Sequence, residues 1–203
     1  MIKGLVKNSK GKLLNKAVIE LKDESFKTIL TAYTDENGYF EIKRKSGFYP
    51  YMTVVKDYCE NYLEFWGLNI DLKENYNFEI TIGTNEIYGL NVFEVNGSKF
   101  PIFIYFRPMN LLKYKNGETD ISPNIEQENI NVMLDGVESK LFKLQKVNEY
   151  IEVNGQYLTS FLIQLVEKKE SWNNLEIKII DKEYEVGQAI IFNRKEKSNK
   201  LYK

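Results

Sequence analysis

The sequence contains no histidine and a single cysteine, Cys59. Without histidine the chain cannot build Ser–His–Asp or Cys–His nucleophiles, His-ligated zinc or imidazole acid–base chemistry. One cysteine cannot form an intramolecular disulfide or a cysteine-clustered zinc or iron–sulfur site. No neighbouring group is present to activate Cys59, so we interpret it as a residue at the edge of the core. The sequence therefore predicts no cofactor and no metal.

Long apolar segments and excess basic charge are also missing. No run of about 18 apolar residues occurs, and the first residues contain no apolar signal segment, so no membrane insertion is predicted. As written, the chain is expected to be cytoplasmic, although a protein whose leader had been removed would look the same and would be secreted or at the cell surface. Lys and Arg total 28 against 29 acidic residues, so nothing favours nucleic acid as a partner. Glycine-rich phosphate-binding motifs are absent.

Period-two alternation of apolar and polar residues is what the sequence has in abundance. This pattern is typical of strands with one buried face. The buried positions it predicts are Ala17, Ile19, Leu21, Phe40, Ile42, Ile102, Ile104, Phe106, Ile130, Val132, Leu134, Leu175, Ile177 and Ile179. Helical spacing is rare, and the best candidate for a short helix is residues 144–151. The fold is predicted to be all-β.

Turn residues and chain length indicate how the strands are grouped. Asn–Gly occurs at 37–38, 96–97, 116–117 and 154–155, and Asp–Gly at 135–136, and these dipeptides tolerate the positive φ angles of tight turns. Frequent short strands with such turns favour sandwiches over a parallel sheet. A chain of 203 residues can hold one large domain or two small ones. We predict two antiparallel β-sandwich domains, 1–83 and 86–193, followed by a basic, flexible tail at 194–203.

The acidic stretch 34–42, TDENGYFEI, could be a metal site, a catalytic carboxylate pair or a bend between strands. A calcium loop placed on Asn37 and Gly38 would need an acidic residue at position 44, where the chain has arginine. Asp35 and Glu36 are adjacent on a solvated turn, which does not separate their pKa values as acid–base catalysis requires. The stretch is therefore predicted to be a hairpin bend.

With its surroundings, this stretch resembles a known family. The matching features, in order, are Gly4 and Val6, Gly11, the strand of Ala17, Ile19 and Leu21, the bend at 34–40, and Gly47–Phe48–Tyr49. Residues 1–83 look like the carboxypeptidase regulatory-like domain, a transthyretin-like (prealbumin-like) β-sandwich. Residues 86–193 resemble no family; their strand and turn pattern predicts a second sandwich of immunoglobulin-like type.

The resemblance implies an accessory module without catalytic residues of its own. In that family the domain occurs beside metallopeptidase domains, in outer-membrane receptors and in surface proteins. This chain departs from that setting because it has no histidine for a zinc peptidase and shows no secretion signal. The resemblance implies a fold and argues against peptidase activity.

Two groups of residues are candidate binding sites. Tyr58, Tyr62, Phe65 and Trp66 lie together where the alternation breaks down, and rings on a loop can anchor a protein or stack on a sugar. The alternative is that these rings cap the first sandwich or fill the seam between the domains. Arg107 has a planar guanidinium suited to a bidentate carboxylate or a ring, and an interdomain salt bridge is its structural alternative.

These observations favour a non-enzymatic binding or scaffold protein whose partner is another protein. A carbohydrate-binding module using the aromatic segment is the alternative. A two-carboxylate hydrolase is the third class, but no motif singles out a pair among the 29 acidic residues.

Overall fold

The all-β prediction is confirmed by a computed structural model, which describes residues 1–43, 46–73, 75–151, 155–166 and 172–194. The strands of the first sandwich are β1 (Ile2–Asn8), β2 (Val18–Lys22), β3 (Thr28–Tyr33), β4 (Tyr39–Ile42), β5 (Phe48–Val55), β6 (Phe65–Asp71) and β7 (Tyr76–Ile82). Those of the second are β8 (Asn85–Glu94), β9 (Ile102–Asn110), β10 (Ile130–Leu134), β11 (Val137–Ser139), β12 (Leu141–Ile151), β13 (Gln156–Leu165), β14 (Asn174–Ile180) and β15 (Val186–Phe192). A short helix, α1 (Leu111–Lys115), and a 3-10 turn, η1 (Gln127–Asn129), interrupt the second set.

The predicted inward positions form the two hydrophobic cores. Ile19 and Leu21 of β2 and Ile104 and Phe106 of β9 are completely buried, as the alternation requires. The glycines of the Asn–Gly and Asp–Gly pairs, from Gly38 to Gly155, all have φ between 65° and 80°. Local pattern and turn chemistry are thus confirmed across both halves of the chain.

The two sandwiches share one continuous sheet. Its order is β11-β10-β14-β15-β6-β5-β2-β3, so half of it comes from each sandwich. The seam is a parallel pairing of β15 with β6, in which Ala189 faces Trp66 and Ile191 faces Leu68. A three-stranded sheet, β4-β1-β7, completes the first sandwich, and a four-stranded sheet, β12-β13-β9-β8, completes the second.

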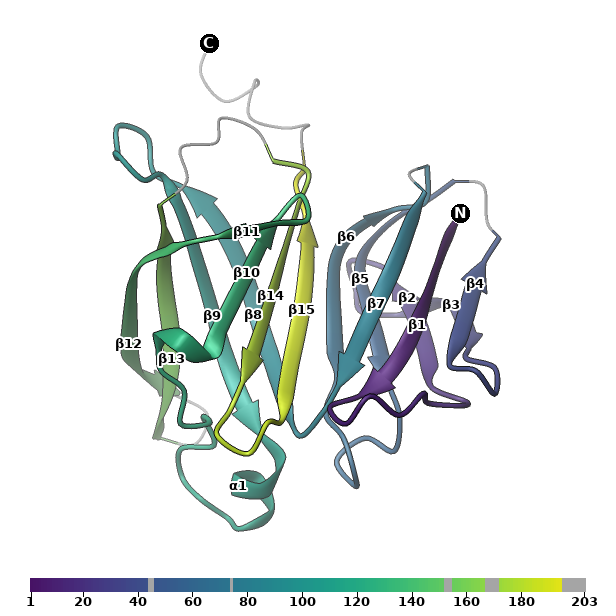
Figure 1. Ribbon diagram of the computed structural model, residues 1–203, viewed down its shortest axis with the longest axis horizontal. Helices are drawn as coiled ribbons and strands as arrows, with labels where there is room; N and C mark the ends of the chain where they lie inside the picture. The colour runs from purple at the N-terminus through teal and green to yellow at the C-terminus, as the bar shows by residue number, and fades with distance from the viewer. Residues whose placement is uncertain (44–45, 74, 152–154, 167–171, 195–203) are drawn as a thin grey trace.

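These two smaller sheets cover opposite faces of the shared sheet, as the two ends of Figure 1 show. Neighbouring side chains at the seam point to different cores: Ile190 belongs to the first core, whereas Ala189 and Ile191 belong to the second. On β6, Phe65 lies in the first core and Trp66 packs against the second. The chain passes from the first core to the second between Ile82 and Ile87, by way of β7 and β8.

Polar side-chain contacts stabilise the region where the first sandwich meets β15 and the turn before it. Gln188 of β15 binds β7 through Thr81 N (2.7 Å) and Glu79 O (3.0 Å). Ser9 Oγ donates to Glu185 at 2.9 Å. Gly83 is needed at the crossing because a Cβ there would lie 2.4 Å from Ser9 Oγ and 2.5 Å from a backbone oxygen. The sandwiches are therefore joined by side chains as well as by the shared sheet.

Three details of the sequence interpretation need correction. The sandwiches are not purely antiparallel, because β15–β6 and β1–β7 are parallel pairs. Residues 144–151 are not a helix; they belong to β12, which pairs with β13 along a long antiparallel ladder that outweighs local helical spacing. The only α-helix in the part of the chain described is α1, in a connection where no helix was predicted. The predicted flexible tail lies, from residue 195 on, outside the described residues.

The stretch 34–42 is a bend, as predicted, but not a hairpin. It joins β3 of the eight-stranded sheet to β4 of the three-stranded sheet, and these strands do not pair. Asp35 Oδ1 accepts the backbone N–H groups of Asn37 and Tyr39, both at 2.9 Å. The carboxylate of Asp35 is used to close the turn.

Candidate binding groove

The floor of the candidate groove is the face of β5 and β6 that points away from the first core. Thr53 pairs with Trp66, and Tyr51 with Leu68, so these four side chains share that face. The second sandwich covers only part of it, and β8 is the edge strand that runs alongside. Where the edge of one sandwich meets the face of the other, an aromatic groove remains.

Two half-exposed rings form the walls of this groove. Phe26, from the turn between β2 and β3, lies over Trp66 with ring centroids 5.7 Å apart and an interplanar angle of 27°. Tyr88 of β8 meets Trp66 edge-on, also at 5.7 Å. Phe26 is 46% exposed and Tyr88 41%. The volume of this open groove is about 540 Å³, and its lining residues are Phe26, Tyr51, Glu64, Trp66, Leu68, Tyr88, Gly89 and Leu90.

The turn that carries Phe26 is one of four turns with the same hydrogen bonds. In each, the side-chain oxygen of an Asn or Asp accepts the backbone N–H groups two and four residues later, at 2.9–3.1 Å. The four residues are Asn8, Asp23, Asp35 and Asp181. Short polar side chains favour this turn because they replace a backbone acceptor.

The residue three positions after each Asn or Asp has a positive φ. It is glycine in two turns, Gly11 (78°) and Gly38 (70°), but Phe26 (63°) and Tyr184 (62°) in the others. A bulky L-residue is strained in this region, by about 1–2 kcal/mol. The Phe26 turn thus holds an aromatic ring over the groove at the expense of backbone strain.

Carboxylates lie beside and beneath the rings. Glu86 is 1% exposed; its Oε1 accepts Trp66 Nε1 at 2.8 Å and its Oε2 accepts the backbone N–H of Glu64 at 3.3 Å. Burial raises the pKa of Glu86. Burial, and then the nearby charge of Glu86, raise the pKa of Glu64 to about 7. Glu64 lines the groove, whereas Glu86 is turned into the structure.

Further across the same face, Glu20 and Lys22 form an ion pair of 2.6 Å. Lys22 is only 8% exposed, and its Nζ lies 4.7 Å from the centroid of the Phe26 ring. Thr53 pairs with both Glu20 and Trp66 and is completely buried. Its Oγ1 has no hydrogen-bond partner among the described residues.

The four aromatic residues predicted to form one patch are divided by the structure. Phe65 is 1% exposed in the first core, so its prediction as a binding residue is wrong: inward alternation resumes at β6. Tyr62 is half-buried against the first core, and Asn8 Nδ2 donates to its hydroxyl at 3.4 Å. Tyr58 is 45% exposed, and burial, Glu86 and Glu64 raise its pKa. Trp66 is the member of the predicted set that lines the groove.

Arg107 forms the predicted ion pair, but not between the sandwiches. It donates from both Nε (2.8 Å) and Nη2 to Glu149, which also accepts the hydroxyl of Tyr105 at 2.5 Å. All three belong to the four-stranded sheet of the second sandwich. The hydrogen bonds from Arg107 lower the pKa of Glu149 to about 2. Because the guanidinium is engaged in this way, Arg107 serves the sheet's own structure.

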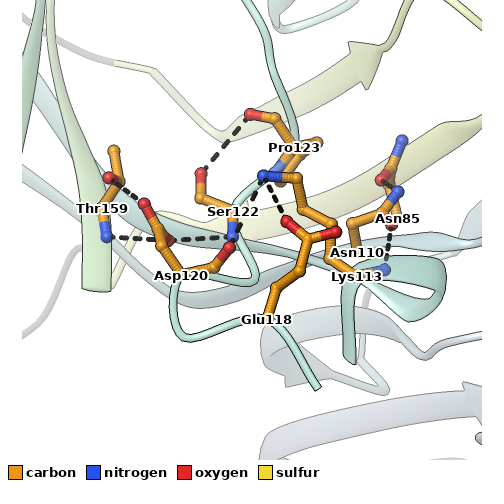
Figure 2. Close-up of polar contacts among 8 residues, drawn as sticks. All are labelled: Asn85, Asn110, Lys113, Glu118, Asp120, Ser122, Pro123 and Thr159. Carbon is orange, nitrogen blue, oxygen red and sulfur yellow. Dashed lines mark hydrogen bonds and ion pairs between the residues drawn. The ribbon is translucent and has the colours of Figure 1, made fainter. Parts of the chain in front are cut away.

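A second polar cluster surrounds the connection after α1 (Figure 2). Asp120 accepts Thr159 Oγ1 at 2.5 Å and Ser122 N at 3.0 Å. Burial alone would raise the pKa of Asp120, but these hydrogen bonds outweigh burial and the pKa is lowered. Lys113 bridges Glu118 and the backbone of Asp120. The polar groups bind one another, and the adjoining cavity of about 100 Å³ is small, so this cluster anchors the loop to β13.

Trp66 is the one lining residue that was predicted; the other three aromatic residues of the groove, Phe26, Tyr51 and Tyr88, were missed from sequence, as was Glu64. Tyr51 and Tyr88 belong to strands, where outward aromatic positions are common, and nothing local distinguishes them. A signal for Phe26 did exist, because the spacing from Asp23 to Phe26 repeats that from Asp35 to Gly38.

The described residues provide no group of three or more His, Cys, Asp or Glu side chains placed to hold a metal ion. Nor do they contain a helix with the length and apolar character needed to cross a membrane. The groove is thus characterised by aromatic rings and carboxylates.

No protein-family model matches the chain, and no curated protein matches it in sequence. The solved structures to which the chain is similar include the following two. BcpA, the major pilin subunit of Bacillus cereus, is similar over 94% of this chain and 66% of its own, with 14% identity and a TM-score of 0.30. A DUF3823 family protein from Bacteroides ovatus is similar over 95% of this chain and 98% of its own, with 10% identity and a TM-score of 0.31. The function proposed below is argued from this chain's own geometry.

Proposed function

We propose that this chain is a non-catalytic binding module whose aromatic groove holds a partner protein. The observation that carries the proposal is the pair of half-exposed rings, Phe26 and Tyr88, that flank Trp66 around a volume of about 540 Å³. Aromatic rings offer a large contact area with few rotatable bonds, and they dominate the binding energy of protein interfaces. Their exposure in the absence of a partner leaves apolar surface for a partner to cover.

The groove has a firm base. Trp66 and Leu68 lie on β6, which is hydrogen-bonded to β5 on one side and to β15 on the other. The strand therefore cannot shift without breaking the seam between the sandwiches. A preformed surface loses little entropy on binding, which favours affinity.

The carboxylates support binding rather than hydrolysis. A two-carboxylate mechanism needs both groups beside the scissile bond. Both oxygens of Glu86 already accept hydrogen bonds, and its side chain is buried away from the groove. Among the residues that line the groove, Glu64 is the carboxylate, so the geometry favours a binding role.

We also propose that residues 1–83 are a carboxypeptidase regulatory-like domain and that the second sandwich is immunoglobulin-like. Support for the first comes from the order of its strands and turns in the sequence, and from the sandwich that they form. An accessory module of this kind agrees with a binding role.

A photo-crosslinking experiment tests the function. A benzophenone amino acid placed at Tyr88 should capture a distinct protein from extracts of the source cells, and Trp66→Leu in the same chain should abolish the capture. The matched control is the same amino acid at Tyr184, which is 80% exposed and does not line the groove. Equal products from both positions, or capture that survives Trp66→Leu in a folded chain, would overturn the proposal.

A carbohydrate is the second candidate ligand. The exposed ring of Tyr88 offers a face on which a sugar can stack, and the carboxyl of Glu64 beside it can accept a hydrogen bond from a sugar hydroxyl. Binding to a glycan array that is lost in Trp66→Leu while the circular dichroism spectrum is retained would favour this candidate. No binding across the array would eliminate it.

A further inference from the structure

We propose that the aromatic groove recognises a positively charged side chain, lysine or arginine, presented by the partner protein. The inference rests on the function proposed above and specifies its chemistry. It follows from the carboxyl that lines the groove and from the arrangement of the rings.

The titratable groups around the groove are mainly carboxyls. Glu64 lines the groove, Glu20 and Glu86 lie near enough to act on Glu64, and Lys22 is the cation that acts on it. Lys22 is already paired with Glu20, and both oxygens of Glu86 accept hydrogen bonds, so Glu64 is left without an ion-pair partner in the described structure. A cation in the groove would pair with the ionised form of Glu64.

The rings suit a cation as well as an apolar group. The face of an aromatic ring attracts an ammonium or guanidinium group within about 6 Å of its centroid. The protein already shows this contact once, since Lys22 Nζ lies over the ring of Phe26. Trp66 and Tyr88 offer further ring surface beside Glu64, where an incoming cation would meet ring and carboxylate together.

The negative charge also predicts that binding depends on pH. Burial and Glu86 favour the protonated form of Glu64, and a bound cation favours the ionised form. The other groups that act on it are Lys22, which favours ionisation, and Glu20, which opposes it. Since the pKa of Glu64 is about 7, affinity for a cation should rise about tenfold from about pH 6 to about pH 8.

Amide-detected NMR titration tests the inference. The probes are capped peptides of glycine with one central lysine or arginine, and the neutral comparison is the same peptide with acetyl-lysine. The cationic peptides should shift the indole N–H of Trp66 and the amides around Glu64 and Tyr88, with affinity rising with pH. Acetyl-lysine should bind at least about tenfold more weakly, because it lacks the charge.

Matched variants identify the groups responsible. Glu64→Gln should weaken cation binding and flatten its pH dependence while keeping the size of the side chain. Phe26→Gly should weaken binding and remain folded, since glycine occupies the equivalent place in the turns of Asn8 and Asp35. Tyr184→Gly, in the same type of turn but outside the groove lining, should leave binding unchanged.

The possible results distinguish a failure of the cation inference from a failure of the proposed protein-binding function. Equal binding of the charged and neutral peptides, or no binding of either, overturns the cation inference. Site-specific crosslinking at Tyr88 would then still support the protein-binding function. Cation binding that survives Glu64→Gln with its pH dependence intact also contradicts the inference. If neutral oligosaccharides shift the Trp66 indole and the cationic peptides do not, the carbohydrate candidate replaces both.

Discussion

The protein builds the same junction twice, once on each side of its shared sheet, and completes the two differently. On one side the edge strand β7 lies against β15, and on the other the edge strand β8 lies against β15 and β6 (Figure 1). At the β7 junction, Gln188 bridges the gap. At the β8 junction, Glu86 bridges part of the gap and the aromatic groove occupies the rest.

The chemistry of the two bridging side chains explains the difference. The Gln188 amide uses both its acceptor and its donors, because Oε1 accepts Thr81 N and Nε2 donates to Glu79 O and Glu176 Oε1. It closes the β7 junction without bringing a charge of its own. Glu86 places a carboxylate beneath Trp66, and Glu64 adds a second one nearby. The first junction is a structural seam, whereas the second leaves the carboxyl of Glu64 beside an aromatic groove.

Gln188→Leu should have the largest effect on stability. The substitution replaces the amide with an apolar side chain of similar size and leaves Thr81 N–H and Glu79 C=O without their partner, at a cost of about 2–4 kcal/mol in the free energy of unfolding. Urea denaturation measures the change. Gln145→Leu, at an exposed glutamine of β12, is the control and should change stability by less than about 0.5 kcal/mol. A small effect at Gln188 would show that its hydrogen bonds contribute little to the β7 junction.

Glu64 should make the protein less stable as pH rises. Its pKa is about 7 in the folded protein, above the ordinary value of 4.5 that applies when unfolded. The folded state therefore binds the proton more tightly, and stability is lost as pH increases between these two values. Because Glu64 is partly exposed, we expect a loss of about 1–2 kcal/mol.

Thermal denaturation of the wild type and Glu64→Gln between about pH 4 and about pH 8 measures this contribution. The decrease in stability with rising pH should be smaller in Glu64→Gln than in the wild type. Glu176→Gln, at the β7 junction, removes a carboxyl whose pKa is also raised by burial but whose ionised form is favoured by Lys178 and Gln188, so it should have a smaller effect of the same sign. A decline unchanged in Glu64→Gln would contradict the assignment.

Substitutions in the strained turns should have the smallest effect on stability. Phe26 lies in the groove and Tyr184 outside it, so the two can be compared. Tyr184→Gly should stabilise the protein by about 0.5–1 kcal/mol, because it removes the left-handed strain and a side chain that is 80% exposed. Phe26→Gly relieves the same strain but loses ring contacts with Trp66 and Tyr51, so its net effect should be less favourable. Melting temperatures measure both.

Gly11→Ala is the reverse experiment. Its φ is 78° and an added Cβ would meet nothing within 4 Å, so the loss of stability, about 1 kcal/mol, should report strain alone.

Equal gains from Tyr184→Gly and Phe26→Gly would mean that the ring of Phe26 contributes no packing energy to the groove.

The sequence predicted which side chains face inward and where glycine turns occur, since each depends on neighbouring residues. It placed Trp66 among the candidate binding residues, but together with Tyr62 and Phe65, because proximity along the chain was taken for proximity in space. In β6, adjacent residues point to opposite faces, so Phe65 entered the core and Trp66 the groove. Arg107 was predicted to bind a partner or to form an interdomain salt bridge, but it pairs with Glu149 of its own sheet, and that contact depends on the pairing of β13 with β9 and β12.

By itself, the sequence determined an all-β chain without histidine chemistry, because alternation and composition are properties of the chain alone. The tertiary structure decided that two sandwiches share one sheet and cover opposite faces of it. That arrangement depends on the pairing of β15 with β6, which no local sequence pattern predicts. The groove exists because of this pairing, which places the edge of β8 beside the outer face of β5 and β6 and leaves Phe26, Trp66 and Tyr88 around a shared space.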